Sequence, residues 1–166
     1  MKFKTIIIIL LACIANVACN NNMDTKDTKK DTEKDLISIN LIPSLEEYQS
    51  LKLTDVKWKL IGFADAKQEK IKMAEPESER CYLLQFNDDN TLSGMSSSNE
   101  IGGGYETSSE SSMKIGARAH TKVNEIYDGE LYMKCLNNVN TFSMTEKGLA
   151  LYYDSNKFLL FKPIKP

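Results

Sequence analysis

The stretch Val56-Lys57-Trp58-Lys59-Leu60 alternates apolar and basic side chains. Successive side chains of a β-strand point to opposite faces of the sheet, so this period of two predicts a strand with one buried face. Trp58 is the single tryptophan of the chain and is expected at the centre of that face. These five residues therefore indicate a fold built from half-buried strands.

The same period recurs along the chain, between turn residues. Tyr82, Leu84 and Phe86 alternate in this way, and the polar run Asn87-Asp88-Asp89-Asn90 that follows is typical of a tight turn. Short strands separated by turns favour an antiparallel barrel or sandwich. The expected strands cover residues 56–60, 81–86, 91–96, 113–119, 141–145, 149–153 and 158–161.

One helix interrupts the strands. Leu131, Cys135 and Val139 recur at four-residue spacing, and Asp128 is in position to cap the first turn. The predicted fold is therefore mainly β (α+β), an antiparallel barrel-like domain with one helix. The side chains expected in its core are Trp58, Tyr82, Leu84, Phe86, Leu131, Leu149, Leu151 and Phe161.

Length and charge restrict the function classes. The 166 residues include 21 basic and 23 acidic side chains, which gives a net charge of −2. Nucleic-acid binding that is driven by charge needs a basic excess, so no nucleic-acid partner is expected. The length fits one globular domain with attachments.

Residues 1–18 have the layout of a secretory signal peptide. Lys2 and Lys4 precede an apolar run over residues 5–14, and Ala18 ends the segment. A helix that crosses a bilayer needs about 20 apolar residues, and this run is about half as long. We therefore expect export and removal of residues 1–18.

A cysteine follows the expected cut. Val17-Ala18-Cys19 resembles a bacterial lipobox, in which the cysteine is acylated and becomes the new amino terminus. Leu10-Leu11-Ala12-Cys13 fits the local pattern better but leaves an apolar core of only about seven residues. We predict a covalent lipid on Cys19, with Cys13 as the alternative site, and no other cofactor. The lipid makes a membrane the expected partner and the bacterial envelope, at the outer membrane, the expected location.

The segment after Cys19 changes composition twice. Residues 19–35 are highly charged, with Met23 as the single apolar residue after the cysteine, which predicts a disordered tether. Residues 36–53 are expected to form an extension with a short helix over about 45–52, begun by a capping box of Ser44 and Glu47. The domain itself is expected over residues 54–166.

The order of several short motifs resembles the META domain of the HslJ-like family. These motifs are Trp58-Lys59-Leu60, Tyr82-Leu83-Leu84-Gln85-Phe86, Asn99-Glu100-Ile101-Gly102-Gly103-Gly104-Tyr105, Thr121-Lys122-Val123-Asn124-Glu125, the 131–136 helix, Leu149-Ala150-Leu151 and Phe158-Leu159-Leu160-Phe161. The resemblance covers roughly residues 54–162. Ser97 stands where the family pattern has its first glycine.

The resemblance implies a compact, mostly antiparallel β-domain with a helix. Family members are often carried on bacterial envelope lipoproteins and are linked to stress response and drug tolerance. The family has no agreed reaction, so the resemblance does not imply catalytic residues.

Catalytic and metal-binding patterns are weak in this chain. His120 is the only histidine, and no Gly-x-Ser-x-Gly nucleophile elbow accompanies it. A zinc site needs three or four closely spaced ligands, which one histidine and two distant cysteines do not supply. We expect no metal and no catalytic residue.

Cys81 and Cys135 remain after the leader is removed. In an oxidising compartment they can form a disulfide, which would stabilise the fold by about 4 kcal/mol in the chain-entropy description. The alternative is two reduced cysteines that pack as small apolar side chains. The sequence leaves both open.

Residues 96–105 hold three glycines, Asn99 and several serines. Glycines at this density favour special backbone angles or close approach, so we expect a bulged turn between two strands, with Tyr105 returning to the sheet. The alternative is a partner-facing loop that presents Asn99, Gly102, Gly103 and Gly104 to another molecule.

The expected function follows from these features. We expect a non-catalytic envelope lipoprotein that binds a protein or an envelope component. One alternative is a barrel-type carrier of a small apolar ligand, because a β-barrel can enclose a cavity. A hydrolase is the remote alternative.

Overall fold

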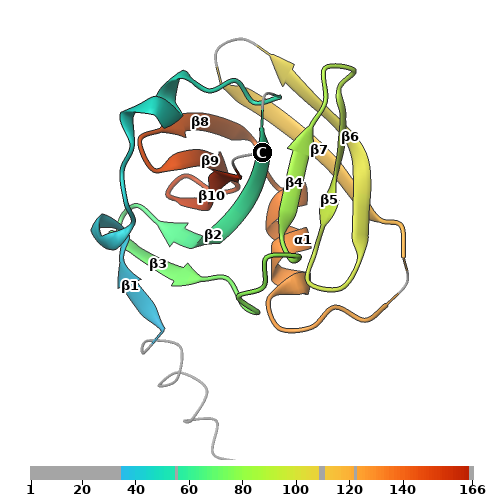
Figure 1. Cartoon of the computed structure of the whole chain (residues 1–166), viewed down its shortest axis with the longest axis horizontal. Helices are drawn as coiled ribbons and strands as arrows, with labels where there is room; N and C mark the ends of the chain where they lie inside the picture. Colours follow the sequence, from blue (N-terminus) through green and yellow to red (C-terminus); the bar gives the residue numbers. More distant parts are fainter. Residues whose placement is uncertain (1–34, 55, 109–110, 122, 165–166) are drawn as a thin grey trace, which may run out of the picture.

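The computed structural model describes residues 35–54, 56–108, 111–121 and 123–164. Within them, ten strands form one antiparallel sheet and a single α-helix packs against it (Figure 1). This confirms the prediction of a mainly β, antiparallel fold with one helix. The strands are β1 (Leu36–Ser38), β2 (Lys57–Asp65), β3 (Lys70–Met73), β4 (Leu83–Phe86), β5 (Thr91–Met95), β6 (Glu100–Ser108), β7 (Ser112–Ala119), β8 (Thr141–Thr145), β9 (Gly148–Tyr152) and β10 (Lys157–Ile164). The helix α1 spans Gly129–Asn137.

The sheet closes on itself. Its strands follow the order β1-β3-β2-β10-β9-β8-β7-β6-β5-β4, and β4 pairs in addition with β2, where Trp58 lies opposite Leu84. The strands from β2 to β4 therefore form a ring (Figure 1). The alternation read from the sequence turns the apolar side chains to the inside of this ring. Its largest fully buried side chains include Trp58, Tyr82, Phe86, Tyr132 and Phe161.

The ring has one weak seam, between β7 and β8. These strands pair only at Ser112 and Thr141. Farther along β7, helix α1 replaces β8 as the hydrogen-bonding partner. The Asn137 side chain accepts a hydrogen bond from the amide of Ala117 at 2.9 Å and donates one to its carbonyl at 3.1 Å. One side-chain amide thus satisfies the two backbone groups that a neighbouring strand would otherwise bind.

Two predictions about helix α1 are wrong, one about its buried face and one about its cap. Leu131 was expected in the core, but its side chain is 42% exposed because the helix turns Tyr132, Cys135 and Leu136 inward instead. Asp128 does occupy the N-cap position, yet its side chain makes no capping hydrogen bond. The remaining predicted core residues, Trp58, Tyr82, Leu84, Phe86, Leu149, Leu151 and Phe161, are buried.

The extension over residues 36–53 belongs to the folded body. Its first residues form β1, which pairs with β3, a strand that the sequence analysis missed. Ile42 packs with Ile71 and Phe158 in a second, smaller core on the outside of the ring. The expected helix is a short 3-10 helix over Glu46–Ser50. Its N-cap is Leu45, so the predicted capping box is wrong: Ser44 lies one residue too early and accepts instead from Lys147 Nζ at 2.9 Å.

The bulged turn expected over residues 96–105 is also wrong in its extent. The three glycines lie inside the regular strand β6, and among the described glycines only Gly148 has a positive φ. Gly103 is required for another reason: a Cβ there would collide with the carbonyl oxygen of Gly116 on β7. Close approach between strands, not an unusual backbone angle, explains this glycine.

Of the helices in the described part of the chain, none is long and apolar enough to span a membrane.

Candidate functional site

A partly buried carboxylate organises the turn between β5 and β6. Glu125 accepts hydrogen bonds from the hydroxyls of Ser96 and Ser97, each at 2.6 Å, and from Nδ2 of Asn99 at 2.7 Å. We call these four residues the Glu125 cluster. They join the β5–β6 turn to the loop that leads into α1.

Asn99 uses its whole side chain inside the protein. Its Nδ2 also donates to the carbonyl of Val123 at 2.8 Å, while its Oδ1 accepts from the Val123 amide and the Thr121 hydroxyl, each at 2.9 Å. The residue is only 2% exposed. The prediction of Asn99 as a partner-facing residue is therefore wrong, because its side chain has no free donor or acceptor to offer.

The helix begins directly against this cluster. A Cβ on Gly129 would collide with Ser97 Oγ and with the side chain of Glu125, so any larger residue at the first position of α1 would displace the cluster. The preceding residue, Asp128, is held from the other side by Lys72 Nζ at 2.5 Å and by the amide of Glu75 at 2.9 Å. This salt bridge explains why Asp128 does not cap the helix.

The cluster favours the ionised form of Glu125. Partial burial raises the pKa of this carboxyl, but the hydrogen bonds from Ser96, Ser97 and Asn99 together outweigh burial. The net effect holds the pKa below the ordinary value of 4.5. Ser96 and Ser97 thus serve to hold a carboxylate.

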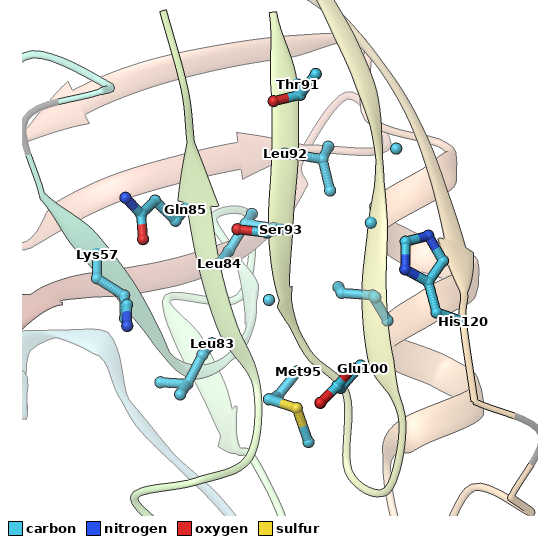
Figure 2. Close-up of a pocket in the computed structure, with 14 residues that line it drawn as sticks. Lys57, Leu83, Leu84, Gln85, Thr91, Leu92, Ser93, Met95, Glu100 and His120 are labelled. Atoms are coloured by element: carbon cyan, nitrogen blue, oxygen red, sulfur yellow. The ribbon is translucent and has the colours of Figure 1, made fainter.

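A separate feature lies on the outer face of β4, β5 and β6. It is a hollow of about 590 Å³, which we call the outer hollow (Figure 2). Its lining residues are Lys57, Leu83, Leu84, Gln85, Thr91, Leu92, Ser93, Gly94, Met95, Glu100, Ile101, Gly102, Gly103 and His120. It is the concave surface to which Gly102 and Gly103 contribute.

The strand register explains the shape of the outer hollow. Gln85 on β4 pairs with Ser93 on β5, and Ser93 pairs with Gly102 on β6, so one row across the sheet carries its smallest side chains at the centre. Leu83 and Met95 form the neighbouring row and give it an apolar wall. The floor is therefore mostly backbone, framed by longer side chains.

The rim of the outer hollow is polar at opposite sides. Figure 2 shows Lys57 and Gln85 on one side and His120 on the other, with Ser93 between them. His120 is exposed, and its ring packs where a Cβ of Gly102 would be, so Gly102 provides the room for the imidazole. The hollow can hold a ligand with a flat or apolar middle and polar groups at both ends.

The predicted site residues fall into different places. Gly102 and Gly103 line the outer hollow, whereas Asn99 is buried in the Glu125 cluster and Gly104 lies on the next stretch of β6. Sequence reasoning missed Ser93, Leu83 and Met95. The signal available in the sequence was the alternation of the strands, which turns these three residues to the outer face of the sheet. The small side chain of Ser93 on that face could have indicated a hollow.

The disulfide weighed between Cys81 and Cys135 does not form, since both thiols are free and buried. The Cys81 thiol donates to the carbonyl of Ser97 at 3.3 Å. Cys135 lies on α1, where burial raises the pKa of its thiol. Each packs as a small apolar side chain, which is the second of the two alternatives.

Two further predictions concern metals and the lipid. Within residues 35–54, 56–108, 111–121 and 123–164, no group of three or more potential metal ligands comes together. The predicted acylation sites, Cys19 and the alternative Cys13, lie outside the described residues.

Comparisons with known proteins identify the fold alone. No family model matches the chain, and no curated protein matches its sequence significantly. The crystal structure of a DUF4847 family protein from Bacteroides vulgatus aligns with a TM-score of 0.52 at 12% identity, over 69% of this chain and 96% of that chain. The NMR structure of a protein from Burkholderia xenovorans aligns with a TM-score of 0.55 at 16% identity, over 75% of this chain and 91% of that one. At such identities the likeness is one of fold.

The Asn99→Ala variant should lose about 2–3 kcal/mol of unfolding free energy, because it removes four hydrogen bonds in a buried place. Urea denaturation measures this loss. Asn138→Ala is the matched control: its amide makes one exposed bond, to the carbonyl of Lys134, and its loss should stay below about 0.5 kcal/mol. Equal, small losses in both variants would contradict a structural role for Asn99.

The Glu125 cluster also predicts a dependence of stability on pH. Because the pKa of Glu125 is lowered in the folded protein, the unfolded chain takes up its proton at the higher pH. The contribution is therefore fully present above pH 4.5 and is lost as the pH falls through the folded pKa. Urea denaturation between about pH 6 and pH 3 should show a smaller loss of stability for Glu125→Gln than for the wild type. Identical pH slopes would refute the assignment.

Proposed function

We propose that this protein is a lipid-anchored bacterial envelope protein that binds another protein or an envelope component at the outer hollow. The hollow itself supports the proposal most strongly. Its floor of backbone and small side chains at Ser93 and Gly102 leaves a concave, side-chain-poor area on an exposed sheet face. Leu83 and Met95 supply apolar contact, and Lys57 and His120 supply polar contacts at the rim.

Binding, rather than catalysis, fits the side chains of this surface. Ser96 and Ser97 donate to Glu125, so their hydroxyls are committed to that carboxylate. His120 lies at the rim of an open hollow, and in the described part of the chain no serine hydroxyl is hydrogen-bonded to its ring. A nucleophile and a base within hydrogen-bonding distance are what a hydrolase would need.

The closed ring of strands supports the finer assignment of a META-like barrel. The order of motifs and the closure of β4 on β2 agree with a small antiparallel barrel that carries one helix. The resemblance to the HslJ-like family adds a proposed role in stress response or drug tolerance. The predicted leader and Cys19 add the lipid anchor, in the envelope at the outer membrane.

A carrier of a small apolar ligand remains the alternative function. Such a ligand would have to occupy the inside of the ring, where Trp58, Tyr82 and Phe161 are fully buried. The hydroxyl of Tyr132 is, among the described residues, the one buried side-chain polar atom without a hydrogen-bond partner. The packed interior favours the outer hollow as the place where a ligand binds.

Filling the outer hollow tests its function. Ser93→Trp places a large ring on its floor and, because Ser93 is exposed, should leave the melting temperature nearly unchanged. We expect this variant to lose the partner that is captured by cross-linking in intact cells.

Glu106→Trp is the matched control, since Glu106 is an exposed residue of the neighbouring strand β6 and lies outside the hollow. It should keep the partner. Capture that is unchanged by Ser93→Trp would refute the outer hollow as the binding site.

The lipid anchor is tested separately. Cys19→Ala should release the domain from the membrane fraction or leave an uncleaved precursor, because the acylated thiol is gone. Labelled fatty acid should no longer appear on the chain. Label that persists on Cys19→Ala would move the anchor to Cys13, and the absence of label from the wild type would refute the anchor itself.

A further inference from the structure

Large exposed apolar side chains gather in the segment that leads into α1 and in the first turn of the helix. Val123 is 60% exposed, Ile126 48%, Tyr127 73% and Leu131 42%. We call these four residues the apolar loop. Single exposed apolar residues are ordinary, but four within nine residues indicate a surface that contacts another apolar phase.

Hydrogen bonds to the Glu125 cluster hold the backbone of the apolar loop in place. Both the amide and the carbonyl of Val123 bind the Asn99 side chain, and the amide of Ile126 donates to Ser97 Oγ at 3.0 Å. Backbone groups of the loop thus bind to the Glu125 cluster, and the loop's side chains point outward. A surface that is ordered in advance loses little conformational freedom on contact.

Tyr127 adds a second, independent sign. Its φ is 47°, in the left-handed region that non-glycine residues seldom adopt. Backbone strain of this kind persists at sites where the placement of a side chain matters. Here it accompanies the most exposed ring of the loop, and tyrosine is a residue that settles at the interface between water and lipid.

The start of the described chain is linked to this loop through one strand pairing and one salt bridge. Leu36, at the start of β1, is the register partner of Lys72 on β3, and neighbouring strands lie about 5 Å apart. Lys72 in turn binds Asp128, the residue after Tyr127. The end of the segment that would carry the lipid on Cys19 therefore lies on the same side of the molecule as the apolar loop.

We infer that the apolar loop lies against the lipid bilayer that holds the acylated amino terminus. The inference rests on the proposed lipid anchor, which keeps the loop close to the bilayer. At such an effective concentration a few apolar side chains suffice for lasting contact. The anchor and the loop together give the domain a fixed side toward the membrane.

The test uses the mature, acylated full chain in vesicles of phosphatidylethanolamine and phosphatidylglycerol with brominated acyl chains, which quench tryptophan on contact. Tyr127→Trp places a probe in the apolar loop. Trp58 is fully buried and supplies the same background in every variant. We expect the added emission of Tyr127→Trp to be quenched several times more strongly than that of a control probe.

Asp88→Trp is that control. Asp88 is an exposed residue in the β4–β5 turn, at the opposite end of these strands from the Glu125 cluster. Acylated protein in which both probes are quenched equally, or neither is, overturns the inference and leaves the lipid anchor intact. Mass spectrometry that finds no acyl chain on the protein overturns the anchor and the inference together. Loss of a cross-linked protein partner from Tyr127→Ser, without lipid quenching of Tyr127→Trp, assigns the loop to a protein and also overturns the inference.

Discussion

The carboxylate of Glu125 is partly withdrawn from water, and three side chains that donate hydrogen bonds to it favour its ionised form. These hydrogen bonds join the β5–β6 turn to a segment almost thirty residues later in the chain. Asn99 strengthens the joint by binding both backbone groups of Val123. The position of α1, the start of β6 and the course of the apolar loop all depend on this one cluster.

The two neighbouring glycines of β6 show how the same residue type serves opposite faces of a sheet. Gly102 faces outward and makes room for the ring of His120, which gives the outer hollow its rim. Gly103 faces the other strand so closely that a Cβ would meet the carbonyl of Gly116. The first glycine shapes a surface for binding, and the second lets β6 and β7 approach. Their adjacency in the sequence hides this difference.

The single helix also has a definite structural reason. The ring of strands is incomplete where β7 and β8 diverge after one residue pair. Unpaired backbone groups of Ala117, a buried residue, would be costly there, and the Asn137 side chain binds both. The helix therefore completes the sheet with its side chain and fills the opening with Tyr132 and Leu136. This arrangement explains why Leu131 is left on the outside.

Local patterns in the sequence were sufficient for seven of the ten described strands, the polar turn at residues 87–90 and most of the core, because alternation along a strand is read within a few residues. They did not predict β1, β3 or the glycine-rich strand β6. They also placed the helix in the right segment. The prediction for Leu131 failed because four-residue spacing does not say which side of a helix meets the sheet. The strand β3 was missed because its partners, β1 and β2, are defined only by the fold.

The site was less accessible to sequence reasoning. Asn99 and three glycines stand together in the chain, but burial separates an internal hydrogen-bonding residue from glycines that line an outer surface. The outer hollow exists because Gln85, Ser93 and Gly102 come into one row, and that row follows from the register of three strands. The sequence by itself determined which residues alternate and where the chain turns, since these depend on neighbours along the chain. The tertiary structure decided which polar groups find one another across the sheet, because hydrogen bonds between distant segments form only once the strands have closed.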